Sequence, residues 1–246
     1  MSASEEAYLS LEEPPRSDHL WRYTPWKRVH PTGNPNEIPD GISTPEISLS
    51  MINGEEASEI SLEMGNAISI PFEGSLVSNS FLSAITNGKA IRITIPENWR
   101  NETPLILDVK PTGGLDAVHI HVETGKFSEA TILTRVQGSS EWLGILRTGH
   151  TGVGSFLQDV FVNKARDGNL MRVDALKLGR DSSVTAGTVS AGSACTKADI
   201  RYLLDAPGSN LNVLGSLLSA DQMHLDHHIE ISHLAPNTYS RLAWHT

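Results

Sequence analysis

The chain has 246 residues, of which 39% are apolar and 20% are charged, and its formal net charge is −10. This composition excludes a disordered or fibrous protein, and the acidic balance with scattered Lys and Arg argues against a nucleic-acid ligand. No apolar run reaches the roughly 20 residues that cross a bilayer. The N-terminus is acidic where a signal peptide is basic, so we expect a cytoplasmic protein without a membrane partner.

Residues 1–46 are predicted to form a short helical arm followed by a linker. Ser4 stands before Glu5 and Glu6, the order found at a helix start, and Pro14 with Pro15 must interrupt any helix. From residue 31 onward, closely spaced Pro and Gly residues fix φ or permit turns, which indicates a linker.

Residues 47–111 are interpreted as a mixed α/β lead-in to the main domain. Segments 67–70 and 90–95 alternate apolar and polar residues with the period of two that indicates strands. One helix is predicted over residues 75–86, and the Asn-Gly pair at positions 87 and 88 predicts a turn after it.

The main domain is predicted over residues 112–246. Strand patterns recur at nearly even spacing, without a convincing helix, at residues 105–109, 118–122, 130–136, 142–147, 156–162, 170–178, 183–189, 198–204, 209–218 and 224–232. Such a series is typical of a sandwich, a barrel or a solenoid. The turns within 178–184 and 204–211 resemble each other, and this self-similarity favours a solenoid of stacked turns.

The segment around residue 227 is a possible metal site. Alternate side chains of a strand share a face, so one face would present His224, Asp226, His228 and Glu230. Imidazoles and carboxylates on one face could bind a transition metal, although a solvated outer face explains the same pattern. His227 falls on the opposite, apolar face, where a hydrogen-bonded core histidine is expected.

A second histidine pair, His119 and His121, supports an alternative function as a cupin-like metal-binding protein. The His-x-His spacing places two imidazoles on one strand face. Glu123 shares that face, but in cupins the glutamate lies further from the second histidine. The default interpretation is therefore that these are exposed histidines of a strand. Cys195, the only cysteine, is flanked by small residues. No basic residue nearer than Lys197 is present to lower the pKa of its thiol, so we interpret it as a small buried residue.

No motif of this chain indicates an enzyme. A dinucleotide-binding glycine pattern, a phosphate-binding lysine loop and a nucleophile elbow are all missing from the sequence. A carbohydrate-active β-helix, such as a polysaccharide lyase, is a further alternative. Such enzymes act outside the cell, so the missing signal peptide counts against it.

Two motifs resemble one protein family. The sequence Trp21-Arg22-Tyr23-Thr24 resembles the opening signature of SufD-type proteins, and the block from His224 to Ser240 resembles the core of SufB and SufD proteins. Within that block the family pattern falls on His233, Pro236, Thr238 and Ser240. The chain is therefore similar to the SufB/SufD family of iron–sulfur cluster assembly scaffold proteins. A cluster-bearing subunit needs thiolates, so the single cysteine favours the SufD-like role.

The resemblance implies a fold and a way of acting. The expected fold is mainly β, a right-handed parallel β-helix core with a short helical N-terminal arm. The expected function is a scaffold subunit that acts through partners and is not itself an enzyme. No cofactor is expected to be held stably by this chain alone, and a transient iron–sulfur cluster is expected only within a complex.

The resemblance also implies partners. These are a SufB/SufD-type chain, or a second copy of this chain in a dimer, and a SufC-type ATPase. Family members continue past the Ser240 block into further rungs and a helical domain that holds SufC, so SufC is the less expected partner here. A solenoid that stops after a strand exposes an unpaired edge, which predicts association.

Overall fold

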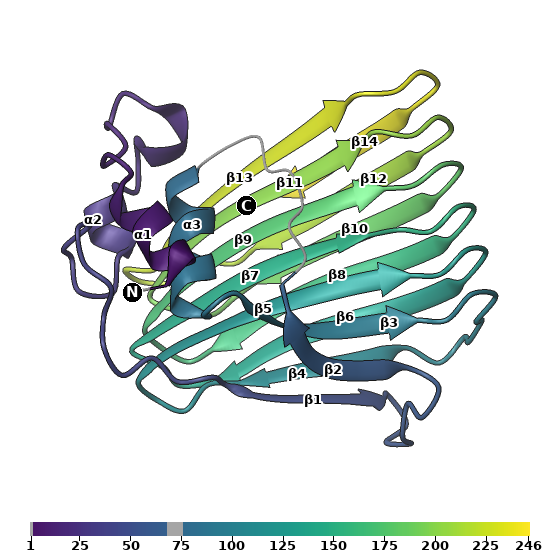
Figure 1. Cartoon of the computed structure of the whole chain (residues 1–246), viewed down its shortest axis with the longest axis horizontal. Helices are drawn as coiled ribbons and strands as arrows, with labels where there is room; N and C mark the ends of the chain where they lie inside the picture. Colours follow the sequence, from purple (N-terminus) through teal and green to yellow (C-terminus); the bar gives the residue numbers. More distant parts are fainter. Residues whose placement is uncertain (1, 68–75) are drawn as a thin grey trace.

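A computed structural model describes residues 2–67 and 76–246, which form a β-solenoid of two stacked sheets (Figure 1). The first sheet, called here the β7 sheet, has the order β13-β11-β9-β7-β5-β3-β2. The second, the β8 sheet, has the order β1-β4-β6-β8-β10-β12-β14. From β3 onward, successive strands alternate between the sheets. The predicted parallel β-helix with a short helical N-terminal arm is therefore confirmed.

The strands are β1 (Glu46–Met51), β2 (Ser61–Asn66), β3 (Lys89–Ile95), β4 (Leu105–Lys110), β5 (Leu115–Thr124), β6 (Glu129–Gly138), β7 (Trp142–His150), β8 (Phe156–Ala165), β9 (Asn169–Leu178), β10 (Ser183–Ser190), β11 (Cys195–Leu204), β12 (Asn210–Leu217), β13 (His224–His233) and β14 (Tyr239–His245). The helices are α1 (Ala3–Leu9), the 3₁₀ helix η1 (His19–Trp21), α2 (Trp26–Val29) and α3 (Leu76–Ile85).

Stacked turns repeat every 27 residues through the middle of the solenoid. Phe156 pairs in parallel with Glu129 and with Ser183, each 27 positions away. Buried serines recur at this spacing in one set of corners, and each donates its hydroxyl to a glycine carbonyl three residues earlier: Ser128, Ser155 and Ser182. A Cβ on Gly152 would lie 2.5 Å from the carbonyl of Gly125. Small residues are therefore required where the corners stack.

The apolar core lies between the two sheets, where every second side chain of most strands points inward. Ile120, Ile145 and Ile200 of the β7 sheet are at most 1% exposed. They pack against side chains of the same kind on the β8 sheet, including Ile132, Leu157, Val184 and Leu211. β-branched and other apolar residues at alternate positions suit strands that are buried on one face.

A buried ionic group interrupts this core. The group consists of Arg147 on β7 and of Arg172 and Asp174 on β9, and each of these residues is at most 6% exposed. Arg172 Nε donates to Asp174 Oδ1 at 2.9 Å, and Arg147 donates to Asp174 Oδ2 at 2.9 Å. Arg147 also donates to Asp159 of the facing sheet at 2.7 Å, and the Arg172 guanidinium lies 3.8 Å from the Phe161 ring centroid. Burial by itself raises the pKa of a carboxyl, but the two arginines hold the pKa of Asp174 below its ordinary value.

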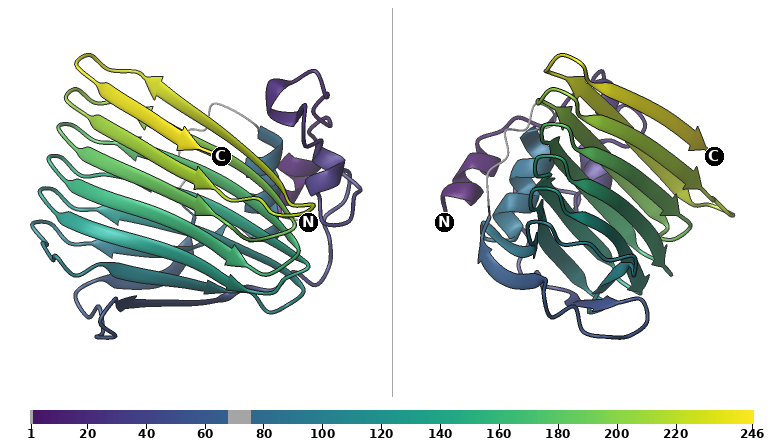
Figure 2. Two further views of the ribbon diagram at one scale, coloured as in Figure 1. Left: turned by 180° about the vertical axis from the view of Figure 1, so that it is seen from behind. Right: turned by 90° about the vertical axis from the view of Figure 1, so that its right-hand side faces the viewer.

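The N-terminal helices and α3 cover one end of the outer face of the β7 sheet (Figure 2). Trp26, Phe81 and Trp142 are at most 1% exposed at the centre of this aromatic cluster. Trp142 Nε1 donates to the carbonyl of Val29 at 2.7 Å, which joins the arm to strand β7. A Cβ at Gly144 would lie 2.4 Å from the Trp142 ring. The indole therefore fits against the sheet only because residue 144 has no side chain.

The two ends of the solenoid differ. At the first end, the sheets finish in the antiparallel strands β1 and β2, which pair with β4 and β3. At the other end, no described residue pairs with the outer edges of β13 and β14. Leu242 on β14 pairs in parallel with the inward-facing Val213 on β12, yet it is 50% exposed. We call the exposed side of β13 and β14, including Leu242, the terminal face.

Several local predictions can be compared with these elements. The predicted helix over 75–86 is α3 within the described residues, and the predicted strand over 90–95 is β3. The predicted strand over 67–70 lies outside the described residues except for Ala67. Helix α1 begins earlier than predicted, because Ser2 and not Ser4 is the N-cap and forms a capping box with Glu5. Across 2–67 and 76–246, no helix is long and apolar enough to cross a membrane.

His30 is expected to make the aromatic cluster sensitive to acid. The ring is 3% exposed and lies 4.6 Å from the Phe81 ring centroid, and burial lowers its pKa to about 4, an effect that Glu37 weakly opposes. An unfolded histidine titrates near pH 6.5, so the unfolded chain binds this proton first. Stability should therefore fall as the pH drops from about 6.5 to 4, by at most about 1.4 kcal/mol per pH unit for this group.

Urea unfolding at a series of pH values checks this expectation. His30→Phe keeps an aromatic ring in place and should flatten the dependence on pH within that window. An unchanged slope in the variant would show that another group titrates.

Candidate functional site

The Trp21–Thr24 motif and the His224–Ser240 block meet in space. Thr24 is fully buried, and its hydroxyl donates to the carboxylate of Asp226, while the same oxygen lies 2.8 Å from Nε2 of His224, 200 residues away in sequence. Trp21 is 1% exposed and packs in the aromatic cluster. Arg22 and Tyr23 are exposed. Trp21 and Thr24 therefore hold the arm on the solenoid, whereas Arg22 and Tyr23 face outward.

Lys197 on β11 joins the same contact. Its side chain is buried, and Nζ donates to the backbone carbonyl of Leu20 and, at 2.8 Å, to Asp226. The ammonium also lies 5.4 Å from the Trp21 ring centroid. A buried ammonium needs such partners, so Lys197 and Asp226 stabilise the docked arm together.

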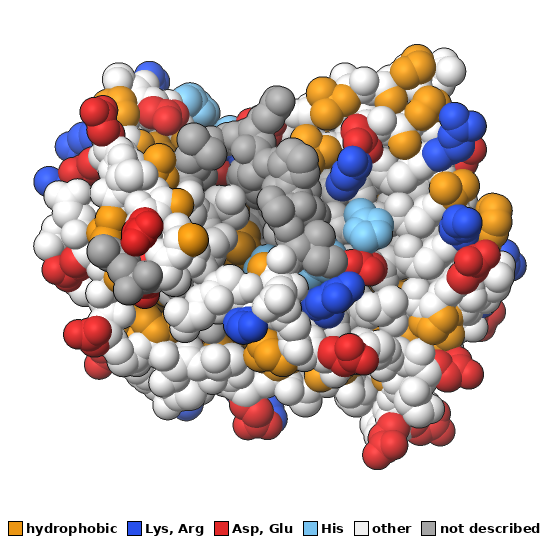
Figure 3. Space-filling view, viewed as in Figure 1, with side chains coloured by type: hydrophobic (Ala, Val, Ile, Leu, Met, Phe, Trp, Pro, Cys, Tyr) orange, Lys and Arg blue, Asp and Glu red, His pale blue; other side chains and the backbone are white. Residues whose placement is uncertain are grey.

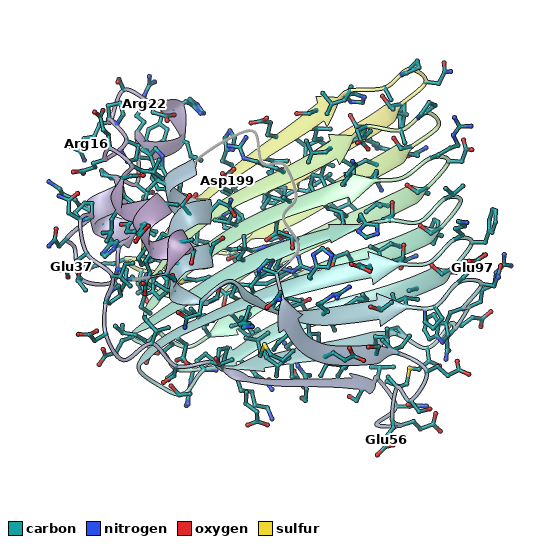
Figure 4. The ribbon with its side chains drawn as sticks, in the orientation of Figure 1. Arg16, Arg22, Glu37, Glu56, Glu97 and Asp199 are labelled. Atoms are coloured by element: carbon teal, nitrogen blue, oxygen red, sulfur yellow. The ribbon has the colours of Figure 1, made fainter. Side chains whose placement is uncertain are left out.

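The remaining two residues of the His224–Glu230 row pair with strand β11. His228 Nδ1 lies 3.0 Å from Asp199 Oδ1, and Arg201 donates to both Asp199 and Glu230. Figure 4 shows Asp199 on the part of the sheet beside the arm that carries Arg22. His224, Asp226, His228 and Glu230 thus share the outer face, but the first two bind Thr24, whereas His228 binds Asp199 and Glu230 binds Arg201. Among the described residues they do not gather into a three-ligand group.

His227 and Cys195 lie in buried environments. The His227 ring lies 5.8 Å from the Trp244 ring centroid, and burial lowers its pKa to about 3. Its Nδ1 is buried and has no hydrogen-bond partner within the part of the chain that the structure describes, so this nitrogen lacks the bond that was expected. Cys195 is buried in register with His224, and burial raises the pKa of its thiol. A neutral thiol is a poor ligand and nucleophile.

The remaining motif residues build the turn between β13 and β14. His233 Nδ1 lies 2.7 Å from Thr238 Oγ1, and Nε2 lies 2.9 Å from Ser240 Oγ. Thr238 also donates to the carbonyl of Ala235. Pro236 begins the tight part of the turn, and Asn237 adopts a positive φ of 58°. The imidazole thus fastens both sides of the turn, which gives this pattern a structural role.

His119 and His121 share the outer face of β5, but both are buried, so the expectation of exposed histidines was wrong, and each ring contacts Thr148. Thr148 Oγ1 lies 2.7 Å from His119 Nε2 and 2.7 Å from His121 Nδ1. Among the described residues, the three side chains whose ligand atoms all lie within 4.8 Å of one another are His121, Glu123 and His150. His119 is not one of them, and burial lowers its pKa to about 4. The solenoid fold and this arrangement do not favour the cupin-like alternative.

The surface of the protein carries mixed charges on the face that Figure 3 draws. Figure 3 shows Lys and Arg side chains interspersed with Asp and Glu. Opposite charges also pair on the outer face of the β7 sheet, where Arg92 lies 3.3 Å from Glu123. This face therefore offers no extended surface of one sign.

Replacing Thr24 by Val tests the contact between the two motifs. The change keeps the shape but removes the hydroxyl from His224 and Asp226, so we expect a loss of about 1–3 kcal/mol in the free energy of unfolding. Limited proteolysis should also cut the arm faster. Thr24→Ser should restore most of the stability, and Tyr23→Ala, at an exposed position, serves as the control. Equal stability of Thr24→Val and wild type would contradict the assignment.

Two comparisons relate these features to known proteins. Residues 109–246 match the family described as SUF system FeS cluster assembly, SufBD core domain. A curated relative, an iron–sulfur cluster assembly SufBD family protein of Mycobacterium leprae (strain TN), is 21% identical over 241 residues. The aligned part covers 96% of this chain and 59% of the relative, so the chain spans less than two thirds of that protein's length.

Proposed function

Since the chain belongs to the SufB/SufD family of the SUF system, we propose that it is a scaffold subunit of an iron–sulfur cluster assembly complex. It acts in the cytoplasm through protein partners and not by catalysis of its own. The observation that carries this proposal is the match to the SufBD core, which runs from the end of β4 through β14. The contact between Thr24 and the His224–Ser240 block supports it, because the two motifs that resemble this family form one structural unit.

The proposed first partner is another SufB/SufD-type chain or a second copy of this chain. A SufC-type ATPase is the second proposed partner.

The chain is proposed to fill the SufD-like place in the complex. Its single thiol is buried with a raised pKa, so this chain by itself offers no thiolate set to an iron–sulfur cluster. The cluster is a transient substrate that is held only together with ligands of the partner chain.

Co-expression with SufB-type and SufC-type proteins, followed by gel filtration and native mass spectrometry, tests the proposal. Wild type should form a defined complex. A stable monomer that binds neither protein would overturn the proposal.

A further inference from the structure

Three potential metal ligands gather on the outer face of the β7 sheet, away from the terminal face and the docked arm. His121 and Glu123 come from β5, and His150 ends the neighbouring strand β7 in register with Glu123. His121 Nε2 lies 3.0 Å from Glu123 Oε1, and the centroids of the two imidazole rings are 6.1 Å apart. The register brings these atoms together because Glu123 and His150 are one solenoid turn apart.

The donor set favours one class of ion. Two imidazole nitrogens and one carboxylate oxygen suit borderline divalent metals such as Zn²⁺ and Fe²⁺. Ca²⁺ and Mg²⁺ prefer oxygen ligands alone. Three protein ligands leave further coordination positions, which water or a small anion would fill.

Thr148 and His119 can orient the His121 imidazole for metal binding. A ligating imidazole usually donates its other ring N–H to an oxygen, which fixes its orientation. Nδ1 of His121 lies 2.7 Å from the hydroxyl of Thr148, and that hydroxyl is 2.7 Å from Nε2 of His119. With a metal on Nε2 of His121, Nδ1–H donates to Thr148, and Thr148 donates to His119. This hydrogen-bond chain gives the buried His119 a role without making it a ligand.

The Arg92 guanidinium contacts the same Glu123 carboxylate. It lies opposite His121 on β3, and its Nη2 is 3.3 Å from Oε1 of Glu123. The guanidinium and a metal would compete for the same carboxylate. The Arg92 side chain is 38% exposed, so it can swing into solvent when a metal enters.

We propose that His121, Glu123 and His150 form a binding site for a borderline divalent metal ion of the Zn²⁺ and Fe²⁺ class. The site needs no partner chain, because all three ligands and the threonine that orients His121 belong to this protein. It therefore stands apart from the scaffold role, and either could fail without the other.

Metal titration of the chelator-treated full chain tests the site. Co²⁺ binding is followed under anaerobic conditions by visible absorption, and Zn²⁺ and Fe²⁺ are then titrated in competition with Co²⁺. We expect one Co²⁺ per chain and displacement by both metals. His150→Ala and Glu123→Gln should each weaken binding by at least about tenfold. His150 is exposed, so its removal should leave the fold intact, as circular dichroism can verify.

Two further variants make the test specific. His245→Ala removes an exposed histidine of β14 and should leave the affinity unchanged. Arg92→Gln removes the competing cation and should tighten binding. Failure of wild type to bind Co²⁺, or equal affinity of wild type and a folded His150→Ala, would overturn the proposal.

Discussion

Replacing Asp174 by Asn is expected to lower the free energy of unfolding by about 3–5 kcal/mol, since it leaves two buried guanidinium groups without their shared counter-charge. Both Asp174 oxygens accept bonds from arginines that are at most 6% exposed. Arg147 would keep the charge of Asp159, whereas Arg172 would keep the neutral Thr188 hydroxyl, the face of Phe161 and at best the amide oxygen of the new Asn. A guanidinium cannot lose its proton to relieve this cost.

Asp108→Asn is the matched control for that experiment. Asp108 also accepts two bonds from one arginine, Arg135, at 2.6 and 2.8 Å, but this pair lies on the outside of the solenoid. The Arg135 side chain is 34% exposed, and solvent screens the pair, so its loss should cost no more than about 1 kcal/mol. Urea unfolding of both variants gives the comparison. Equal losses would mean that the interior group is not the strong element proposed here.

The second large effect is expected at Trp142, where the N-terminal arm meets the solenoid. Trp142→Ala should cost about 3–5 kcal/mol, because it removes a fully buried indole and leaves a cavity above Gly144. Trp142→Phe keeps most of the packing but leaves the Val29 carbonyl without its donor, which should cost about 1–3 kcal/mol.

Proteolysis separates this effect from a general loss of stability. Trp142→Ala should expose the segment before β1 to cleavage under conditions where the strands remain protected. A cleavage rate equal to that of wild type would show that the arm is held elsewhere. For Thr24→Val we expect the same direction with a smaller change, because it breaks another of the contacts that hold the arm.

The sequence was sufficient to predict the strand faces, because side-chain direction along a strand depends only on parity. His224 and Glu230 were predicted to share a face, with His227 on the other, and the register with β11 shows this arrangement. The solenoid was predictable in part, since the turns near 178–184 and 204–211 resemble each other. The full repeat was not recognised, although Ser128, Ser155 and Ser182 recur every 27 positions.

The candidate sites were less predictable because they depend on contacts between distant segments. Nothing local indicates that Thr24 should meet Asp226, or that Lys197 should bind the backbone of Leu20. Two features of the sequence do indicate such contacts. Arg172 and Asp174 occupy the apolar parity of strand β9, and His150 follows Glu123 by one repeat of 27 residues.

The most direct test of the scaffold role is anaerobic cluster assembly in vitro. A SufB-type and a SufC-type protein are supplied with iron, a sulfur donor and ATP, with and without this chain, and cluster transfer to an apo-acceptor enzyme is followed through its recovered activity. We expect that this chain alone transfers no cluster and that its addition to the partners raises the transfer. Transfer by the partners that is the same with and without the wild-type chain would contradict this expectation.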